Sequence, residues 1–267
     1  FLPLMPKAVE SFDFRDYDLV ISDSSAFAKG ILTRRPTVHI CYCHTPTRYL
    51  WQEMDEYVES LAVSWFVKAG VKPYLNFLKR WDYRAAQRPD FFIANSETVQ
   101  GRIRQYYGRD STVIHPPVDT EFFRSRQEKV FARPDNGRSN PDGNRIASHS
   151  LATTSKDYYL TASRLEPYKK IDLVIDAFNK LGLSLKVAGD GTQARILKQK
   201  VRNNIEFLGR VSDEKLRELY GNAQAFVFPA LEDAGIMVLE SLACGTPVIG
   251  FAQGGTAEFV RDGVEGL

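Results

Sequence analysis

The chain has 267 residues, of which 43% are apolar and 25% charged, and its formal net charge is +2. This length suits two domains of about 100 to 150 residues each. The composition is that of an ordinary globular protein, and no run of about 18 apolar residues exists to span a bilayer. The slight positive charge gives no sign of the strongly basic face that nucleic-acid-binding proteins carry.

The cysteines and the chain ends give two further expectations. Cys41, Cys43 and Cys244 are odd in number and show no C-x-x-C spacing, which favours a reducing compartment over a disulfide scaffold. We therefore expect a cytoplasmic protein. The chain begins Phe-Leu-Pro without a methionine or a signal-peptide pattern and stops at Leu267 without a terminating helix, so we expect it to be a fragment.

The first 123 residues alternate short apolar runs with amphipathic stretches, which predicts strands followed by helices. Ser96 follows one apolar run and precedes an amphipathic stretch, so it is a predicted helix N-cap, with Gly108 as the helix stop. Aromatic residues between 49 and 84 recur at spacings that favour burial in helices. The expected strands are 17–22, 37–41, 89–95 and 112–115.

Residues 124–156 differ in composition from the sequence on either side. They are rich in Arg, Asn, Ser, Pro, Gly and Asp, contain few apolar residues and show no periodicity. This composition predicts an interdomain linker between a first domain at 1–123 and a second at 157–267.

The alternation of strand and helix resumes after the linker. Ser212, with Asp213 and Glu214 behind it, predicts another capped helix, because acids in the first turn complement the helix dipole. Two alternating blocks indicate an α/β fold with two Rossmann-like, doubly wound domains, whose ligands bind beyond the carboxyl ends of the strands. The expected strands are 158–162, 184–188, 205–208, 225–228 and 247–251, and the expected helices 171–181, 192–201 and 236–243.

The strongest functional signal is the stretch EDAGIMVLE from Glu232 to Glu240, directly after a predicted strand. One carboxylate lies in the turn and the other in the first turns of the following helix, so both can reach one ligand. Gly235 and the backbone N–H groups of Ile236 and Met237 lie where a helix start offers donors to an anionic or hydroxyl-rich ligand. Alternatively, the acids only complement the helix dipole and the last one is solvated.

This stretch closely resembles the E-x7-E motif of the retaining GT-B glycosyltransferases of family 4, group 1, and the likeness continues through the small-residue segment ACGTPVI at 243–249. The resemblance implies that Glu232 lies near the transferred sugar and that Glu240 hydrogen-bonds the ribose of the nucleotide. Family members commonly carry an aromatic residue where this chain has Ala234. That departure affects how the sugar fits against the turn.

A second candidate site is the segment SRLEPYKK, which contains Arg164 and Lys169 and follows the first strand of the second domain. A departing diphosphate needs cations, and arginine supplies a bidentate fork while lysine supplies a point charge. A solvated basic loop is the alternative interpretation. Because family members bind the diphosphate with an Arg and a Lys at this place, the resemblance assigns that role to Arg164 and Lys169.

Two glycine-containing turns follow the next strands. The Gly-Asp-Gly turn at 189–191 is expected where the backbone approaches another group closely, but without a third glycine it is not a dinucleotide-binding motif. The resemblance extends to FLGRV at 207–211. It implies that the backbone at Gly209 and Val211 lies against the nucleobase.

In the first domain, His44 follows a predicted strand within CYCHTP, at the ligand-facing edge of the sheet. The Cys-x-Cys-His segment has no second set of ligands at a zinc spacing, so no metal site is expected. A lone histidine is usually structural. Family members, however, place a histidine in this loop against the donor sugar, so the resemblance makes His44 a candidate for positioning the sugar rather than for proton transfer.

The resemblance covers nearly the whole chain except the linker and ranks closest to bacterial mannosyltransferases of surface-polysaccharide synthesis. It implies transfer of a hexosyl group from a GDP- or UDP-linked sugar to a glycan or lipid-linked acceptor, with retention of configuration and without a cofactor or essential metal. No nucleic acid is expected as a partner. Contact of the first-domain helices with the inner face of a membrane is an alternative to core packing for the aromatic region.

Two other functions remain open. A nucleotide-sugar 2-epimerase could share the architecture, because fold does not fix chemistry, but it should lack E-x7-E. A non-catalytic sugar-binding or nucleotide-binding homologue could keep the fold and lose turnover, and Ala234 favours that interpretation.

Overall fold

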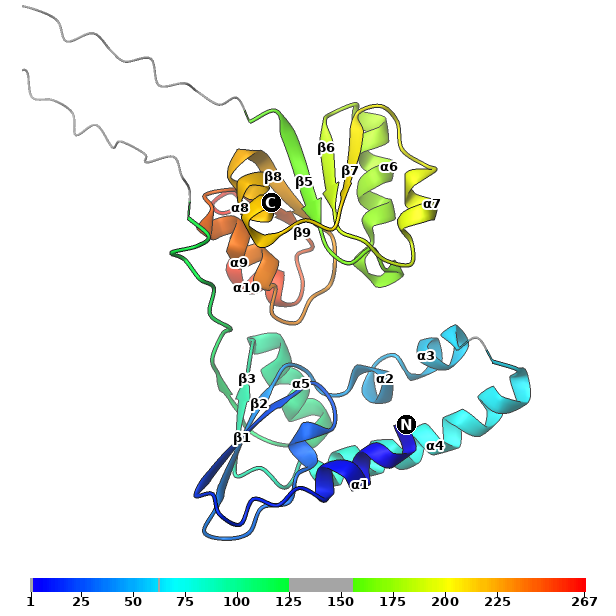
Figure 1. Ribbon diagram of the computed structural model, residues 1–267, viewed down its shortest axis with the longest axis vertical. Coiled ribbons are helices and arrows are strands. Elements are labelled where there is room, and N and C mark those ends of the chain that lie inside the picture. The colour runs from blue at the N-terminus through cyan, green and yellow to red at the C-terminus, as the bar shows by residue number, and fades with distance from the viewer. Residues whose placement is uncertain (1, 62, 125–155) are drawn as a thin grey trace, which may run out of the picture. The chain divides into compact units, whose positions relative to one another are not determined.

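The computed structural model describes residues 2–61, 63–124 and 156–267, which fall into two units. The linker predicted at 124–156 lies, apart from its end residues, outside the described residues. Each unit is an α/β fold built on one parallel sheet (Figure 1). Unit 1 comprises Phe1–Pro117, Leu231–Gly235 and Ala252–Glu258, and unit 2 comprises Val118–Ala230, Ile236–Phe251 and Phe259–Leu267.

The sheet of unit 1 has the strand order β1-β2-β3-β4. Cys43 pairs with Ser24 on one side and with Ala94 on the other, so the carboxyl ends of three strands align at one edge. All four strands form where the apolar runs predict them, with boundaries shifted by a few residues. They are β1 (Leu19–Ser24), β2 (Val38–Cys43), β3 (Phe91–Ala94) and β4 (Thr112–Val113).

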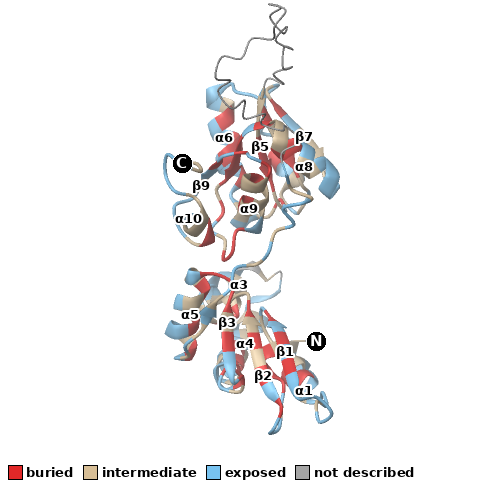
Figure 2. Ribbon diagram, turned by 90° about the vertical axis from the view of Figure 1, so that its left-hand side faces the viewer, coloured by how far each residue is buried: buried red, intermediate tan, exposed pale blue. Residues whose placement is uncertain are grey.

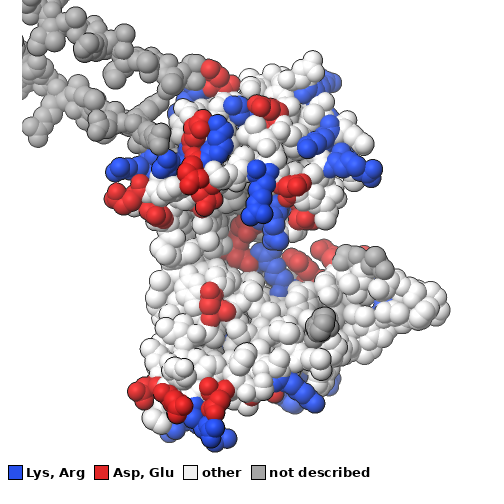
Figure 3. Space-filling model, viewed as in Figure 1, with Lys and Arg blue, Asp and Glu red and all other residues white. Residues whose placement is uncertain are grey.

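Burial alternates along these strands, and the two faces of the sheet differ. Val20 and Phe92 are buried, whereas their neighbours Leu19 and Phe91 are 50% and 62% exposed. In Figure 2, where residues are coloured by burial, buried and exposed residues alternate along the strands of unit 1. Parallel sheets are usually covered on both faces, so the exposed apolar side chains of these described strands are unusual. Charged side chains of both signs are scattered over the visible face of unit 2, and few lie on that of unit 1 (Figure 3).

The helices of unit 1 confirm Ser96 as the predicted N-cap and Gly108 as the predicted helix stop. The described residues of the aromatic region at 49–84 form three helices. Ser96 Oγ accepts a hydrogen bond from Val99 N at 3.1 Å, and Gly108 ends the same helix with φ of 64°. The helical segments are η1 (Leu2–Leu4), α1 (Met5–Glu10), η2 (Ala28–Gly30), α2 (Arg48–Trp51), α3 (Met54–Ser60), α4 (Trp65–Ala85) and α5 (Glu97–Tyr107), where η marks a 3-10 helix.

The long helix α4 corrects the prediction that the aromatic residues are all buried. Trp65 is 80% exposed, because the α4 side chains that pack against a buried cluster begin only at Val71. Trp51, Tyr74 and Trp81 are partly buried. Among the described residues, no helix is both long and apolar enough to cross a membrane.

Unit 2 has the strand order β7-β6-β5-β8-β9, with buried apolar clusters on both faces. One cluster joins the sheet to α6 and α7, and the other joins it to α8 and α9. The elements are β5 (Tyr158–Ala162), η3 (Pro167–Lys169), α6 (Ile171–Leu181), β6 (Leu185–Ala188), α7 (Ala194–Lys198), β7 (Ile205–Gly209), α8 (Asp213–Asn222), β8 (Ala223–Phe228), α9 (Ile236–Ala243) and β9 (Val248–Gly250). The short helix α10 (Gly255–Phe259) lies in unit 1 except for its last residue.

The predicted bounds of α6 and α9 are confirmed, and Ser212 Oγ caps α8 as expected by accepting from Lys215 N at 3.3 Å. The helix predicted at 192–201 is shorter. Gln193 N bonds to the carbonyl oxygen of Leu165 at 2.9 Å, so the backbone before α7 belongs to a turn.

Candidate functional site

Strand-to-helix loops of unit 2 are joined by backbone hydrogen bonds at the carboxyl edge of its sheet. Leu165 N, after β5, donates to Asp190 O at 2.9 Å, and Gly189 N, after β6, donates to Gly209 O at 2.7 Å. Gly209 ends β7 with φ of 67°. The loops after β5, β6 and β7 therefore form one connected surface where ligands of such sheets bind.

The glycines of the Gly-Asp-Gly turn are required by contacts within this surface. A β-carbon at Gly189 would lie 1.8 Å from the carbonyl oxygen of Ser163, and one at Gly191 would lie 2.6 Å from that of Leu165. Gly189 also has φ of 129°, which side chains rarely allow. The sequence predicted that this turn approaches another group closely, and that group is the backbone of the loop after β5.

Arg164 and Lys169 gather around one tyrosine. Arg164 Nη2 donates to the hydroxyl of Tyr168 at 2.7 Å, and Lys169 Nζ lies 5.1 Å from the centroid of the Tyr168 ring. Lys169 Nζ is also 6.0 Å from the ring of Phe228, at the end of β8. Two cations therefore lie together at the carboxyl ends of β5 and β8. A phosphate-bearing ligand at this edge would meet both charges.

Glu240 is partly buried on α9 and faces a buried tyrosine. The hydroxyl of Tyr220 donates to Glu240 Oε2 at 3.3 Å. Burial raises the pKa of Glu240, the hydrogen bond from Tyr220 opposes that rise, and the charge of Asp213 adds to it. Glu240 is therefore not the fully solvated side chain of the alternative interpretation. Of the other predicted contacts, Met237 and Val211 pack against the same apolar cluster. Ile236 is 44% exposed.

Replacing Tyr220 by phenylalanine is expected to raise the pKa of Glu240 further, because the carboxylate loses a donor that favours its charged form. If the carboxylate binds the nucleotide, protonating it should weaken binding. As the pH is lowered, the Tyr220→Phe variant should therefore lose nucleotide affinity at a higher pH than the wild type does. Calorimetric titration with UDP and GDP from neutral to mildly acidic pH measures this shift. Glu240→Gln is the control and should show no such titration, and an unchanged pH profile in Tyr220→Phe would contradict the prediction.

The first half of the E-x7-E stretch packs within unit 1. Gly255 N donates to the carbonyl oxygen of Glu232 at 2.8 Å, and a β-carbon at Gly254 would lie 2.5 Å from that oxygen. Ala234 is buried, and Gly235 has φ of 60°. The segment Ala252–Glu258 therefore braces the loop that carries Glu232 and Gly235.

Asp233, between these residues, forms two ion pairs that the sequence did not predict. Its Oδ2 lies 2.7 Å from Arg48 Nη2, and its Oδ1 is bonded by Arg102 Nη1. Arg102 Nη1 also lies 3.4 Å from Thr45 Oγ1, in the loop after β2. Burial alone would lower the pKa of Arg48, but the charges of Asp233, Glu53 and Glu232 raise it. Two arginines thus fix the loop of Glu232 to α2 and α5.

His44 lies at the carboxyl end of β2, as predicted, and its Nε2 is hydrogen-bonded with Asp23 Oδ1 near the end of β1. Its side chain is 43% exposed. The adjacent thiols are not poised for chemistry, because burial raises the pKa of Cys41 to about 11 and that of Cys43 further still. Asp23 went unpredicted because it lies 21 residues from His44 in sequence and adjoins it only through strand pairing.

The structure brings the predicted residues together in two groups, one in each unit. In unit 2, Arg164 and Lys169 share the edge of the sheet with Gly209, and Glu240 lies on α9 of the same unit. In unit 1, Glu232 and Gly235 lie in the loop that Arg48 and Arg102 hold. A sequence signal for Arg48 was its position four residues after His44, on the helix that leaves the same loop.

Both parts of the chain match known protein families. Residues 1–122 match Glycosyltransferase Family 4, and residues 144–267 match Glycosyl transferases group 1. A D-inositol 3-phosphate glycosyltransferase of Mycolicibacterium paratuberculosis is 31% identical over 201 residues, which are 69% of this chain and 42% of the relative. The protein of the same name from Mycobacterium bovis is 27% identical over 69% of this chain and 38% of its own length. The chain thus spans about two fifths of these relatives.

Solved structures share the architecture at low sequence identity. Anabaena Alr3699/HepE in complex with UDP-glucose gives a TM-score of 0.63 at 20% identity, covering 99% of this chain and 67% of that chain. Sucrose-phosphate synthase from Thermosynechococcus elongatus gives a TM-score of 0.65 at 17% identity, covering 94% of this chain and 60% of that chain. These similarities confirm the predicted α/β fold with Rossmann-like domains.

Proposed function

The chain carries the two domains of a GT-B glycosyltransferase, and on that premise we propose that the protein transfers a hexosyl group from a nucleoside diphosphate sugar to a hydroxyl of an acceptor, with retention of configuration. The bond between the anomeric carbon and the diphosphate oxygen breaks, and a bond from that carbon to the acceptor oxygen forms. The acceptor hydroxyl loses a proton, and the nucleoside diphosphate leaves with the bonding electron pair. A glycan or a lipid-linked sugar is the proposed acceptor.

The observation that carries this proposal is the pair of cations at the carboxyl edge of unit 2. Arg164 and Lys169 meet at Tyr168, beside loops that are already tied to one another. In the proposed reaction they bind the diphosphate and stabilise the negative charge that grows as the glycosidic bond breaks. Because these side chains supply the positive charge, the proposal invokes no metal.

The remaining predicted residues take roles at either end of the donor. Glu240 accepts hydrogen bonds from the ribose, and the backbone at Gly209 and Val211 faces the base. Glu232 and His44 position the transferred sugar, and the backbone N–H groups at Gly235, Ile236 and Met237 bind the same part of the donor. Lysine, arginine and backbone groups of this kind mainly position the reactants, which can account for a large share of catalysis.

Thermal unfolding of the full-length protein with UDP, GDP and their sugars tests the proposal. A nucleotide present at 100 times its Kd should stabilise the fold by about 2.7 kcal/mol. The effect should be selective for one nucleotide and largely lost in Glu240→Ala. If no nucleotide stabilises a well-folded protein, the proposal is wrong.

Product analysis separates the finer parts of the proposal. UDP-glucose is the first donor to try, because it is bound in the Anabaena structure, and GDP-mannose is the second, because the motif resembles that of mannosyltransferases. Proton NMR of the product reports whether the anomeric configuration is retained. Tight donor binding without transfer to any acceptor would instead favour a non-catalytic homologue, and release of a 2-epimeric sugar would favour an epimerase.

A further inference from the structure

Helix α2 is too short to hold its own position. It spans four residues, Arg48–Trp51, and the Thr47 side chain before it makes no capping hydrogen bond to the helix backbone. One turn of helix is not stable alone, because nucleation costs more than a single turn returns. The placement of Arg48 must therefore come from tertiary contacts.

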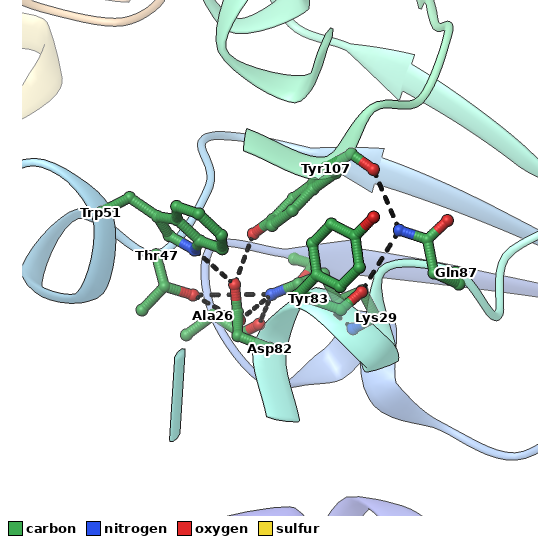
Figure 4. Close-up of polar contacts among 9 residues, drawn as sticks. Ala26, Lys29, Thr47, Trp51, Asp82, Tyr83, Gln87 and Tyr107 are labelled. Atoms are coloured by element: carbon green, nitrogen blue, oxygen red, sulfur yellow. Dashed lines mark hydrogen bonds and ion pairs between the residues drawn. The ribbon is translucent and has the colours of Figure 1, made fainter. Parts of the chain in front are cut away.

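Asp82 of α4 supplies those contacts at both ends of the turn. Its Oδ1 accepts from Thr47 Oγ1 at 2.9 Å, and its Oδ2 accepts from Trp51 Nε1 at 2.8 Å. Figure 4 shows both side chains pointing at the Asp82 carboxylate. A single buried carboxylate thus fixes the residue before α2 and the residue that ends it.

The charge of Asp82 is compensated within the same cluster. Lys29 Nζ lies 2.5 Å from Asp82 Oδ1, and both side chains are 1% exposed. The hydroxyl of Tyr107 donates to Asp82 Oδ2 at 2.8 Å, so α5 contributes a bond to the same carboxylate (Figure 4). A buried ion pair is poor evidence for stability, since apolar residues of similar volume often stabilise as well. What this cluster does supply is a defined orientation.

Arg48 is the residue that this orientation controls. It lies between the two residues that Asp82 holds, and its guanidinium binds Asp233 through Nη2 at 2.7 Å and through Nε at 3.2 Å. Asp233 is adjacent to Glu232 in the loop that the proposed function places at the transferred sugar. A shift of α2 would therefore displace Arg48, which binds that loop.

We propose that the buried Lys29–Asp82 pair is a positioning device, which fixes α2 so that Arg48 holds Asp233 and the loop of Glu232 in place for sugar transfer. Its effect on turnover rests on the proposed function. Thr47 is the positioning residue that can be tested most cleanly, because valine has nearly its shape and removes only the hydroxyl.

The test compares two threonine-to-valine variants. Thr47→Val removes the hydroxyl that donates to Asp82 and contacts Lys29 Nζ at 3.5 Å. Thr37→Val, the matched control before β2, removes a hydroxyl that donates to the carbonyl oxygen of Tyr17 at 2.7 Å and makes no bond to Asp82. A small misplacement of a catalytic loop can cost one to two orders of magnitude in rate, so Thr47→Val is expected to lower kcat about tenfold with little change in the donor KM. Thr37→Val should stay within about twofold of wild type, and Thr47→Ser should restore kcat.

A second measurement does not depend on activity. The coupling between Arg48→Ala and Asp233→Asn, from a double-mutant cycle on unfolding, should fall towards zero in the Thr47→Val background and persist in the Thr37→Val background. Equal coupling in both backgrounds, or equal loss of kcat in both single variants, would overturn the positioning role. A wild-type protein that binds nucleotide but transfers no sugar would refute the proposed function, while the coupling would still decide whether Asp82 positions Arg48.

Discussion

Replacing Lys169 by methionine is expected to lower kcat for sugar transfer by about 10²- to 10³-fold, the usual cost of removing one preorganised group that stabilises developing negative charge. The ammonium of Lys169 and the guanidinium of Arg164 both contact Tyr168 at the carboxyl edge of the unit 2 sheet. The variant therefore leaves one cation for the departing diphosphate. Methionine keeps most of the side-chain volume. Steady-state kinetics with the nucleotide sugar that stabilises the protein measures the loss.

Lys170→Met is the matched control, because this residue is the next in the chain, is exposed, and is the N-cap residue of α6. Its kcat should stay within about twofold of wild type. Similar losses in both variants would mean that general basicity of the loop matters, and the assignment of Lys169 to the diphosphate would then fail.

Gly189→Ala is expected to destabilise unit 2 by about 3 kcal/mol or more, since a strained backbone and an overfilled contact each cost about 1 to 3 kcal/mol. The new methyl group would lie 1.8 Å from the carbonyl oxygen of Ser163, and φ of 129° disfavours any side chain. Urea unfolding at equilibrium measures the change in the free energy of unfolding.

Gly182→Ala separates the two causes. Gly182 ends α6 with φ of 69°, but a β-carbon there would meet nothing within 4 Å. The cost of this variant should therefore be only the backbone penalty of about 1 to 2 kcal/mol. If the two alanine variants lose equal stability, the close contact with Ser163 does not limit the turn.

The bounds of helices and strands were predicted best where a periodic apolar pattern was followed by a residue that favours a helix stop. The helix Ile171–Leu181 is such a case, because Gly182 adopts the left-handed conformation that stops a helix. By contrast, α4 contains Gly70 and Pro73, and it continues through both because its later residues pack against the core. Local preference alone could not predict that tertiary packing would override it.

The residues of the candidate site also differ in whether the sequence could predict them. The basic pair of one loop, Arg164 and Lys169, could be predicted because both residues lie within six positions of each other. Asp233, in contrast, resembled a first-turn acid, and its partners Arg48 and Arg102 lie 185 and 131 residues away in sequence. Contacts at such separation are set by the fold and leave no periodic signal in one sequence.

The bonded loops at the edge of unit 2 bear on the entropy of donor binding. The amides of Leu165 and Gly189 donate to carbonyl groups of neighbouring loops, so their exchange with solvent should be slow. A ligand that enters such a surface spends little of its binding free energy on ordering the backbone. The ordering that remains falls on long side chains such as exposed Arg164, and an unfavourable entropy of binding would arise there rather than in the loops.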